Sequence, residues 1–158
     1  KGALGFRRVR RETAASVGVS DPFDPRDNIH GGARYFVEVR GKLPARIPES
    51  DRTSMALAAY NVGFGHLEDA RVITQMRGGN PDLWTDVRAS LPLLAQEGWY
   101  MQVRRGYARG WEPAQFVRRV RQFYSVLEWQ TLPSIEMALQ AESELLPPAV
   151  EATEVATQ

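Results

Sequence analysis

Apolar residues recur at helical spacing along most of the chain, and this pattern predicts a mainly α-helical domain. The first well-marked helix starts near residue 24, where Asp24 can serve as N-cap and Pro25 suits the first helical position. Its apolar residues fall at i, i+4, i+7 and i+8, forming one predicted stripe of Ile29, Ala33, Phe36 and Val37. Gly31 and Gly32 lie inside this helix, which suggests that another backbone packs closely there.

Further helices are predicted on both sides of this one. The expected ranges are residues 9–17, a helix capped by Ser50 that contains residues 55–59, and then 66–76, 84–89 and 92–97. Loops are expected at 41–48, 77–81 and 98–110, where glycine and proline interrupt the pattern. No segment shows convincing strand alternation.

The last helix has the clearest pattern. Pro113 falls in its first turn, and apolar residues follow at helical spacing: Phe116, Val120, Phe123 and Leu127, with Val117 and Tyr124 beside them. From about Pro133 the chain becomes acidic and loses the stripe. The pattern therefore predicts a helical domain over residues 1–130 and an acidic, mobile or loosely docked tail over 131–158.

Composition is typical of a globular protein and narrows the chemistry. The chain has 158 residues, 43% hydrophobic and 25% charged, and a net charge of +1. It has no cysteine and two histidines, so we expect neither disulfides, nor thiolate chemistry, nor a metal site. No apolar run is long enough to span a membrane, and no signal peptide is recognisable at Lys1. These features predict a cytosolic protein, or a processed or truncated piece of an exported one.

Charge is unevenly distributed. Residues 1–11 hold a basic cluster that includes Arg7, Arg8, Arg10 and Arg11, whereas six glutamates and no basic residue follow from Glu128 onward. Such a cluster can bind phosphates, which makes a basic nucleic-acid-binding domain one alternative. The simpler interpretation is two separately solvated ends, and we predict no nucleic-acid partner.

A polar pair at the end of an apolar helix is the first candidate site. Tyr60 and Asn61 follow the run at 55–59, with Gly63 and Gly65 directly behind them. Asparagine can donate and accept hydrogen bonds at once, which suits amides and sugar hydroxyls, and the glycines would allow a close approach. The alternative is a purely structural one, in which Asn61 caps the helix and Gly63 stops it.

The loop at 98–110 is a second candidate. Its neighbourhood contains Trp99, Tyr100, Tyr107 and Trp111, interleaved with Arg104, Arg105 and Arg109. Aromatic faces can stack on sugar rings or nucleobases, but they can equally anchor a long loop. The carboxylates available for acid catalysis are Glu38, Glu68, Asp69, Glu97 and Glu112, and no local context marks one of them as a raised-pKa acid.

Several ordered segments together resemble the goose-lysozyme-type (SLT-type) catalytic domain of lytic transglycosylases. They read SVGVSDPFDPRDNIHGGARYFVEVR, ALAAYNVGFGHLEDAR, GNPDLWTDVRASLPLLAQEGWY and GYARGWEPAQFVRRVRQFYSVL, and the similarity covers about residues 2–129. The resemblance implies a lysozyme-like helical fold. It also implies an enzyme that cuts the MurNAc–GlcNAc β-1,4 bond of peptidoglycan without water, leaving a 1,6-anhydro-muramoyl end.

The resemblance assigns residue roles as well. Tyr60 matches the tyrosine beside the family's catalytic glutamate, and Asn61 matches the asparagine that faces the sugar N-acetyl group. Gly63 matches the trailing glycine of that motif, Phe116 replaces a cleft tyrosine, and Tyr107 belongs to the aromatic loop. These five are the expected substrate-binding residues. The pocket bordered by Tyr60 and Asn61 is expected to lie near residues 2–8. No cofactor and no metal are implied.

The match departs from the family at its start. The family's glutamate lies in a Glu-Ser pair before the segment that matches residues 2–5, so no residue here matches the catalytic acid. Arg7 and Arg8 also replace apolar residues of the family signature. We therefore expect a domain incomplete at its N-terminus and inactive as an isolated chain, with a non-catalytic glycan-binding module as the main alternative. The implied partner is the glycan strand, at the periplasmic face of the outer membrane, with membrane association only through parts absent from this chain.

Overall fold

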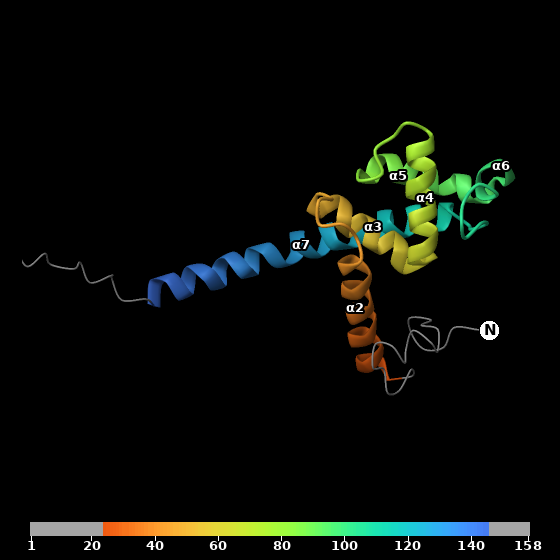
Figure 1. Ribbon diagram of the computed structural model, residues 1–158. Helices are drawn as coiled ribbons and strands as arrows, with labels where there is room; N and C mark the ends of the chain where they lie inside the picture. Colours follow the sequence, from red (N-terminus) through yellow and green to blue (C-terminus); the bar gives the residue numbers. More distant parts are fainter. Residues whose placement is uncertain (1–23, 146–158) are drawn as a thin grey trace, which may run out of the picture. The chain divides into compact units, whose positions relative to one another are not determined.

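The computed structural model describes residues 24–145, and every regular element in that range is a helix (Figure 1). The elements follow in the order α2 (Pro25–Gly41), α3 (Glu49–Val62), α4 (Phe64–Met76), α5 (Trp84–Ser90), the 3-10 helix η1 (Leu91–Ala95), α6 (Glu97–Tyr100) and α7 (Trp111–Leu145). The predicted mainly α fold is confirmed. The helix expected over residues 9–17 lies outside the described residues.

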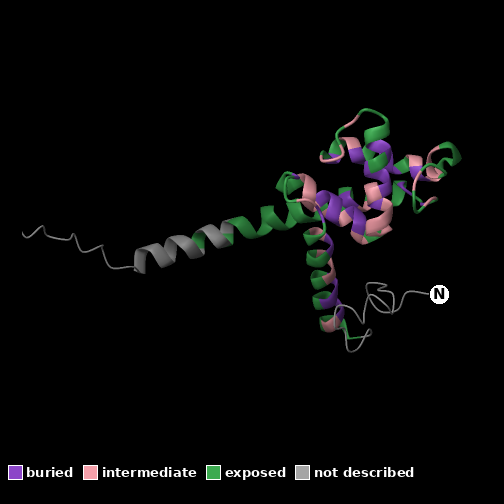
Figure 2. Ribbon diagram, viewed as in Figure 1, coloured by how far each residue is buried: buried purple, intermediate pink, exposed green. Residues whose placement is uncertain are grey.

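Helices α3 and α4 form the centre of the packed part of the chain. Helix α3 packs against α2, and α4 packs against α3, α5 and η1. The buried residues in Figure 2 gather on these helices. Most of the buried residues of α3 have small side chains. The fully inaccessible core residues of the two helices are Met55, Ala56, Ala58, Ala59, Leu67, Ala70 and Ile73. Alanine-rich faces let helix axes approach closely, which gives a dense junction.

Helix α2 begins as predicted but buries a different face. The Asp24 Oδ1 atom accepts a 2.7 Å hydrogen bond from the Asp27 backbone N–H, and Pro25 occupies the first turn. The predicted stripe is wrong, because Ile29 and Val37 are exposed. The side that the helix buries is made of Asn28, Gly31, Gly32 and Val39. It is rotated by roughly a third of a turn from the apolar residues, so small residues have decided which face packs.

The boundaries of α3 and α4 differ slightly from those expected. Ser50 is not the N-cap of α3, because the helix already begins at Glu49 after Pro48; the Ser50 carbonyl instead accepts a 2.9 Å hydrogen bond from the Ser54 hydroxyl. Helix α4 begins at Phe64, immediately after Gly63 and two residues before the predicted start. The two helices are therefore joined by one residue.

A buried arginine fixes the turn that follows α4. The Arg71 guanidinium donates to the Pro81 carbonyl at 3.0 Å, to Glu68 Oε1 at 2.7 Å and to Asp82 Oδ1 at 2.7 Å. Arg46 donates to Asp82 as well. Burial raises the pKa of Asp82, but the hydrogen bonds from Arg46 and Arg71 outweigh it and hold that pKa below its usual value. The predicted turn at 77–81 is thus anchored by charge.

The segment between α5 and α7 is largely as predicted. Helices α5 and η1 match the ranges expected at 84–89 and 92–97, while α6 occupies the start of the predicted 98–110 loop. Gly110 closes this segment against η1: a Cβ atom there would lie 1.6 Å from the Leu91 carbonyl oxygen. Only glycine fits at this contact.

The chain divides into two compact units between Arg119 and Val120, within α7. The domain boundary predicted at residue 130 stays a prediction. Helix α7 continues to Leu145, past the point at which the apolar stripe ends, while the mobile or loosely docked state of the tail stays a prediction. Residues 136–141 are good helix formers, which explains the continuation. Residues 146–158 lie outside the described range.

The apolar stripe of α7 is only partly buried. Val117 is inaccessible, but Phe123, Tyr124 and Leu127 are exposed. Residues 121–132 are exposed on all sides of the helix (Figure 2). The helical spacing was predicted correctly, and only the part of the stripe before residue 121 is buried or partly buried.

Candidate glycan-binding site

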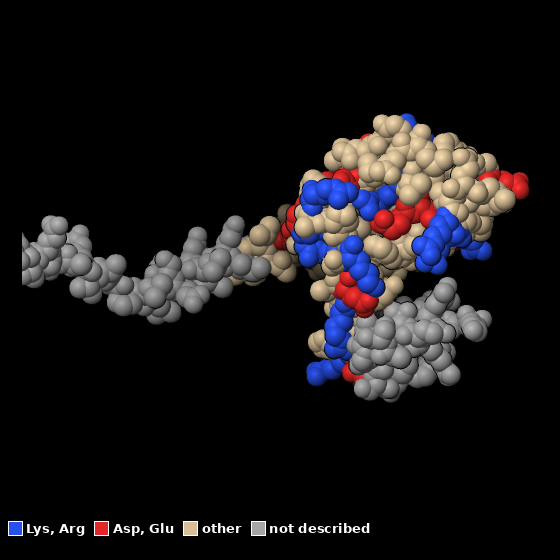
Figure 3. Space-filling view, in the orientation of Figure 1, with Lys and Arg blue, Asp and Glu red and all other residues tan. Residues whose placement is uncertain are grey.

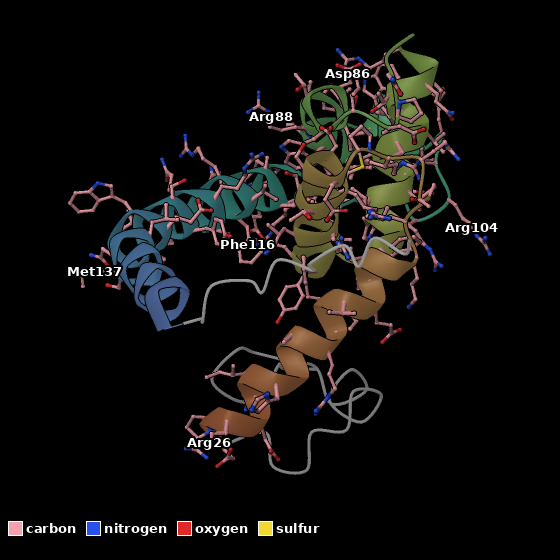
Figure 4. All side chains as sticks on the ribbon, turned by 90° about the vertical axis from the view of Figure 1, so that its left-hand side faces the viewer. Arg26, Asp86, Arg88, Arg104, Phe116 and Met137 are labelled. Carbon is pink, nitrogen blue, oxygen red and sulfur yellow. The ribbon has the colours of Figure 1, made fainter. Side chains whose placement is uncertain are left out.

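Tyr60 lies in the last turn of α3 and is held by two other aromatic rings. Its ring centroid lies 5.5 Å from that of Tyr35 in α2, at an interplanar angle of 54°. It lies 6.3 Å from that of Phe116 in α7, almost parallel at 6°. We call Tyr35, Tyr60 and Phe116 the aromatic cluster; Figure 4 labels Phe116 on α7. Three helices thus fix the position of one predicted site residue.

Asn61 and Gly63 continue from the aromatic cluster along the chain. Asn61 is exposed and does not cap the helix. Gly63 is the cap: its φ is +96°, and its N–H donates to the Ala59 carbonyl at 2.8 Å. No atom of the described residues lies within 4 Å of where a Cβ atom would be at Gly63. Gly63 therefore turns the chain into α4 and also leaves an open surface beside Asn61, so the structural and functional interpretations are compatible.

Gly65 has a different role, which the sequence did not reveal. A Cβ atom there would lie 2.8 Å from Arg105 Nε and 3.0 Å from Arg105 Cγ. The Arg105 side chain therefore lies directly on the first turn of α4. Its backbone N–H donates a 2.7 Å hydrogen bond to Oδ2 of Asp69, a buried carboxylate of α4. The close approach expected at this glycine is made by the chain itself.

Tyr107 lies in a separate aromatic pair. Its ring meets that of Tyr100 edge-on, with centroids 5.8 Å apart, and its side chain is exposed. Trp99 packs partly buried against the core, whereas Trp111 is exposed. The loop therefore contains both loop-anchoring and solvent-facing aromatics. Among the described residues, the ring contacts of Tyr107 do not include the aromatic cluster.

The carboxylates considered for acid catalysis are mostly paired with cations. Glu38 accepts from Lys42 at 2.7 Å, Glu68 from Arg71 at 2.7 Å, and Glu112 from Arg109 at 3.3 Å. Each of these carboxylates accepts a hydrogen bond from a cation three or four residues away in the sequence. Asp69 accepts from the backbone of the loop, and Glu97 is exposed in α6.

One carboxyl outside that set has a strongly shifted pKa. Hydrogen bonds from Arg52 and Arg40 lower the pKa of Glu49 to about 2. A general acid needs the opposite shift. The pairing of Arg109 with Glu112, and a further hydrogen bond that the guanidinium donates to Tyr107, raise the pKa of Arg109.

Charge is mixed on the face drawn in Figure 3. Lysine and arginine side chains form separate patches there, with acidic side chains between them. The Arg7–Arg11 cluster, on which the nucleic-acid alternative rests, lies outside the described residues. So does the segment at 2–8 that was expected beside Tyr60.

Within residues 24–145, no three histidine, cysteine, aspartate or glutamate side chains gather as a metal site would require. In the same range no helix combines the length and the apolar character needed to cross a membrane.

Tyr35 was missed entirely, and for Asp69 and Arg105 the sequence did not reveal the anchoring hydrogen bond or the contact with Gly65. Tyr35 could have been found, because it continues the small-residue face of Asn28, Gly31 and Gly32 by one turn. The contact of Arg105 with Gly65 joins segments 40 positions apart (105 − 65 = 40), and no local pattern indicates it.

Comparison with known proteins gives consistent matches. A family model described as the transglycosylase SLT domain matches residues 1–82. Membrane-bound lytic murein transglycosylase F of Ectopseudomonas mendocina (strain ymp) is 51% identical over 150 residues, which is 95% of this chain and 31% of that protein. The protein of the same name from Saccharophagus degradans is 46% identical over 143 residues, covering 90% of this chain and 28% of its own length. The protein of the same name from Marinobacter nauticus is 49% identical over 144 residues, covering 91% of this chain and 29% of its own length. The chain thus spans less than a third of these relatives' length.

Proposed function

The chain belongs to the transglycosylase SLT domain family, and from this premise we propose that it is the glycan-binding part of a peptidoglycan lytic transglycosylase. The reaction would cleave the MurNAc–GlcNAc β-1,4 bond without water and leave a 1,6-anhydro-muramoyl product. The relatives are named as membrane-bound lytic murein transglycosylases. We extend that activity, with the glycan strand as substrate and the periplasmic face of the outer membrane as location, to this chain as a proposal.

The observation that supports the proposal best is the arrangement around Tyr60. Stacking on Phe116 and contact with Tyr35 fix the tyrosine, and the exposed Asn61 follows it beside the open surface of Gly63. A rigid aromatic base with an adjacent amide is suited to a sugar ring and its N-acetyl group. We assign substrate binding to Tyr60, Asn61, Gly63 and Phe116, and to Tyr107 as a more distant contact.

The proposed chemistry needs one carboxylic acid. It protonates the glycosidic oxygen of the leaving GlcNAc while the C1–O bond breaks. The C6 hydroxyl oxygen of MurNAc then bonds to C1, and its proton returns to the carboxylate, so no water is consumed. Because the nucleophile belongs to the same sugar, its effective concentration is high. The ion pairs of Glu38, Glu68 and Glu112 disfavour these residues as the acid. We propose that it comes from a Glu-Ser segment outside the 158 residues.

Digestion of purified peptidoglycan, followed by mass spectrometry, tests this proposal. The 158-residue chain should release no 1,6-anhydro-muropeptides above background. A longer version carrying the family's Glu-Ser pair ahead of residue 1 should release them, and its Glu→Gln variant should lose about 10²–10⁴-fold in rate. Anhydro products from the 158-residue chain would mean that the acid is present in it, with Glu38→Gln and Glu112→Gln as the first variants to examine.

A non-catalytic glycan-binding module is the second candidate, and the paired carboxylates favour it. It predicts that the longer version binds glycan but makes no anhydro product. The same digestion therefore separates the two functions.

A further inference from the structure

Arg105 is placed on the candidate site by two independent contacts. Its backbone is tied to α4 through Asp69, at 2.7 Å, and Asp69 is only 4% exposed. Its side chain lies on Gly65, where an added Cβ atom would approach within 2.8 Å. Gly65 is two residues beyond Gly63 and four beyond Asn61. The fold therefore holds the Arg105 side chain against a residue that closely follows Asn61 and Gly63, which are assigned to glycan binding.

The guanidinium of Arg105 has no ion pair among the described residues. This distinguishes it from the arginines that serve the fold, such as Arg71 and Arg46, which both bind Asp82. The residue is exposed. An arginine whose stem is fixed and whose planar fork is open is suited to receive a carboxylate through two parallel hydrogen bonds.

Resting on the function proposed above, we infer that Arg105 is a specificity-determining residue that binds a carboxylate of the peptidoglycan strand lying over Asn61 and Gly63. Peptidoglycan offers this group from two sources. One is a carboxylate of the peptide stem, and the other is the lactyl carboxylate of MurNAc, which is free once the stem is removed. Neutral GlcNAc polymers carry neither. Arg105 therefore lets the site prefer peptidoglycan over other β-1,4-linked amino-sugar chains.

Arg104 supplies a matched control. It is the sequence neighbour of Arg105 and carries the same charge, but its side chain points away from the helices into solvent (Figure 4). Arg105→Ala and Arg104→Ala remove the same net charge from the same loop. A difference between them reports the position of the cation rather than the overall charge.

Gly65→Ala tests the same idea without removing any charge. The three atoms nearest to the added methyl group all belong to the flexible side chain of Arg105, so this side chain must move while the backbone can stay. Alanine also favours a helix over glycine. The variant should therefore fold at least as stably as the wild type and still displace the guanidinium.

The experiment measures binding of the 158-residue chain and its variants to three probes. These are purified sacculi with stems, the same strands after amidase treatment, and chitin oligosaccharides. Arg105→Ala and Gly65→Ala should bind sacculi about three- to ten-fold more weakly than wild type, and Arg105→Lys should lose less than Arg105→Ala. Arg104→Ala should stay within about two-fold. None of the variants should change chitin binding.

The three probes separate the possible outcomes. A loss confined to stem-bearing sacculi assigns the stem carboxylate, and a loss that persists after amidase treatment assigns the lactyl carboxylate. Equal effects of Arg104→Ala and Arg105→Ala, or an equal loss on chitin, would overturn the inference while leaving the glycan-binding function intact. Failure of the wild type to bind any of the three probes would instead contradict the proposed function itself.

Discussion

The α3–α4 pair and the part of α7 beyond Val120 carry similar apolar patterns but differ in burial. Met55, Ala59 and Leu67 are completely inaccessible, whereas Phe123 is 71% exposed and Leu127 is 56% exposed. Small residues, a one-residue connection and buried polar anchors accompany the pattern in the first region. The second region has large apolar side chains on an exposed helix. Apolar spacing therefore specifies a helix, while small residues and anchors determine whether it is packed.

The largest expected effect concerns the contact that closes the packed region. Gly110→Ala would place a Cβ atom 1.6 Å from the Leu91 carbonyl oxygen and 2.3 Å from its carbon, so backbone must move. We expect a loss of more than about 3 kcal/mol in the free energy of unfolding, measured by urea denaturation. Gly98→Ala is the control, because nothing lies within 4 Å of that Cβ position. Similar stabilities of the two variants would refute the close contact.

Two leucines compare the regions directly. Leu67→Ala removes an inaccessible side chain and should cost about 2–5 kcal/mol in unfolding free energy. Leu127→Ala removes an exposed one and should change it by less than about 0.5 kcal/mol. Both are measured by urea denaturation with the same probe. An equally large loss for Leu127→Ala would show that something covers the exposed stripe of α7 in solution.

The charged anchor of α4 gives the next effect. Arg71→Leu leaves the partly buried Asp82 without one of its two arginine partners and the Pro81 carbonyl without its donor. We expect a loss of about 1–3 kcal/mol, because removing one partner strands the other groups. Arg88→Leu is the control, since Arg88 is exposed and projects outward from α5 (Figure 4). Equal melting temperatures of the two variants would contradict a stabilising role for the hydrogen bonds of Arg71.

The smallest effect is a pH dependence at the start of α3. The pKa of Glu49 is about 2 in the folded chain, against an ordinary value of 4.5. Its contribution to stability is therefore complete above pH 4.5 and is lost as the pH falls toward 2. Wild type should have a slightly higher Tm than Glu49→Gln at pH 6, and the difference should vanish near the folded-state pKa. Because the carboxylate is exposed, 1 M salt should also reduce the difference; a gap that grows on acidification would contradict the sign.

Local rules explain how much of this structure the sequence could predict. The cap at Asp24, the helix over 84–89 and the turn at 77–81 follow from nearby residues, and all three are present. The buried face of α2 was missed because glycine and asparagine outweighed the larger Ile29 and Val37. The extension of α7 past Pro133 was missed because the loss of the apolar stripe was given more weight than the helix-forming residues at 136–141.

In the candidate site, too, the residues marked by a local pattern were predicted and the tertiary contacts were not. Tyr60, Asn61 and Gly63 stand out as a polar break after an apolar run, and that break coincides with the junction of α3 and α4. The contact of Tyr60 with Phe116 joins helices far apart in sequence, and only the resemblance to the family connected those two residues beforehand. Arg105 on Gly65 is a tertiary contact between a loop and a helix. Such contacts depend on the whole fold and leave no periodic signal.

Residue-resolved NMR titration of the chain with solubilised glycan fragments tests the central claim most directly. If glycan binds as proposed, amide shift changes will appear at residues 60–65 and 104–107, and none will appear at 123–132, the exposed part of α7. We also predict that Tyr60→Ala abolishes the changes at 60–65. Shift changes concentrated on residues 123–132, with those around Tyr60 unaffected, would contradict the proposed site and place glycan binding on the exposed helix.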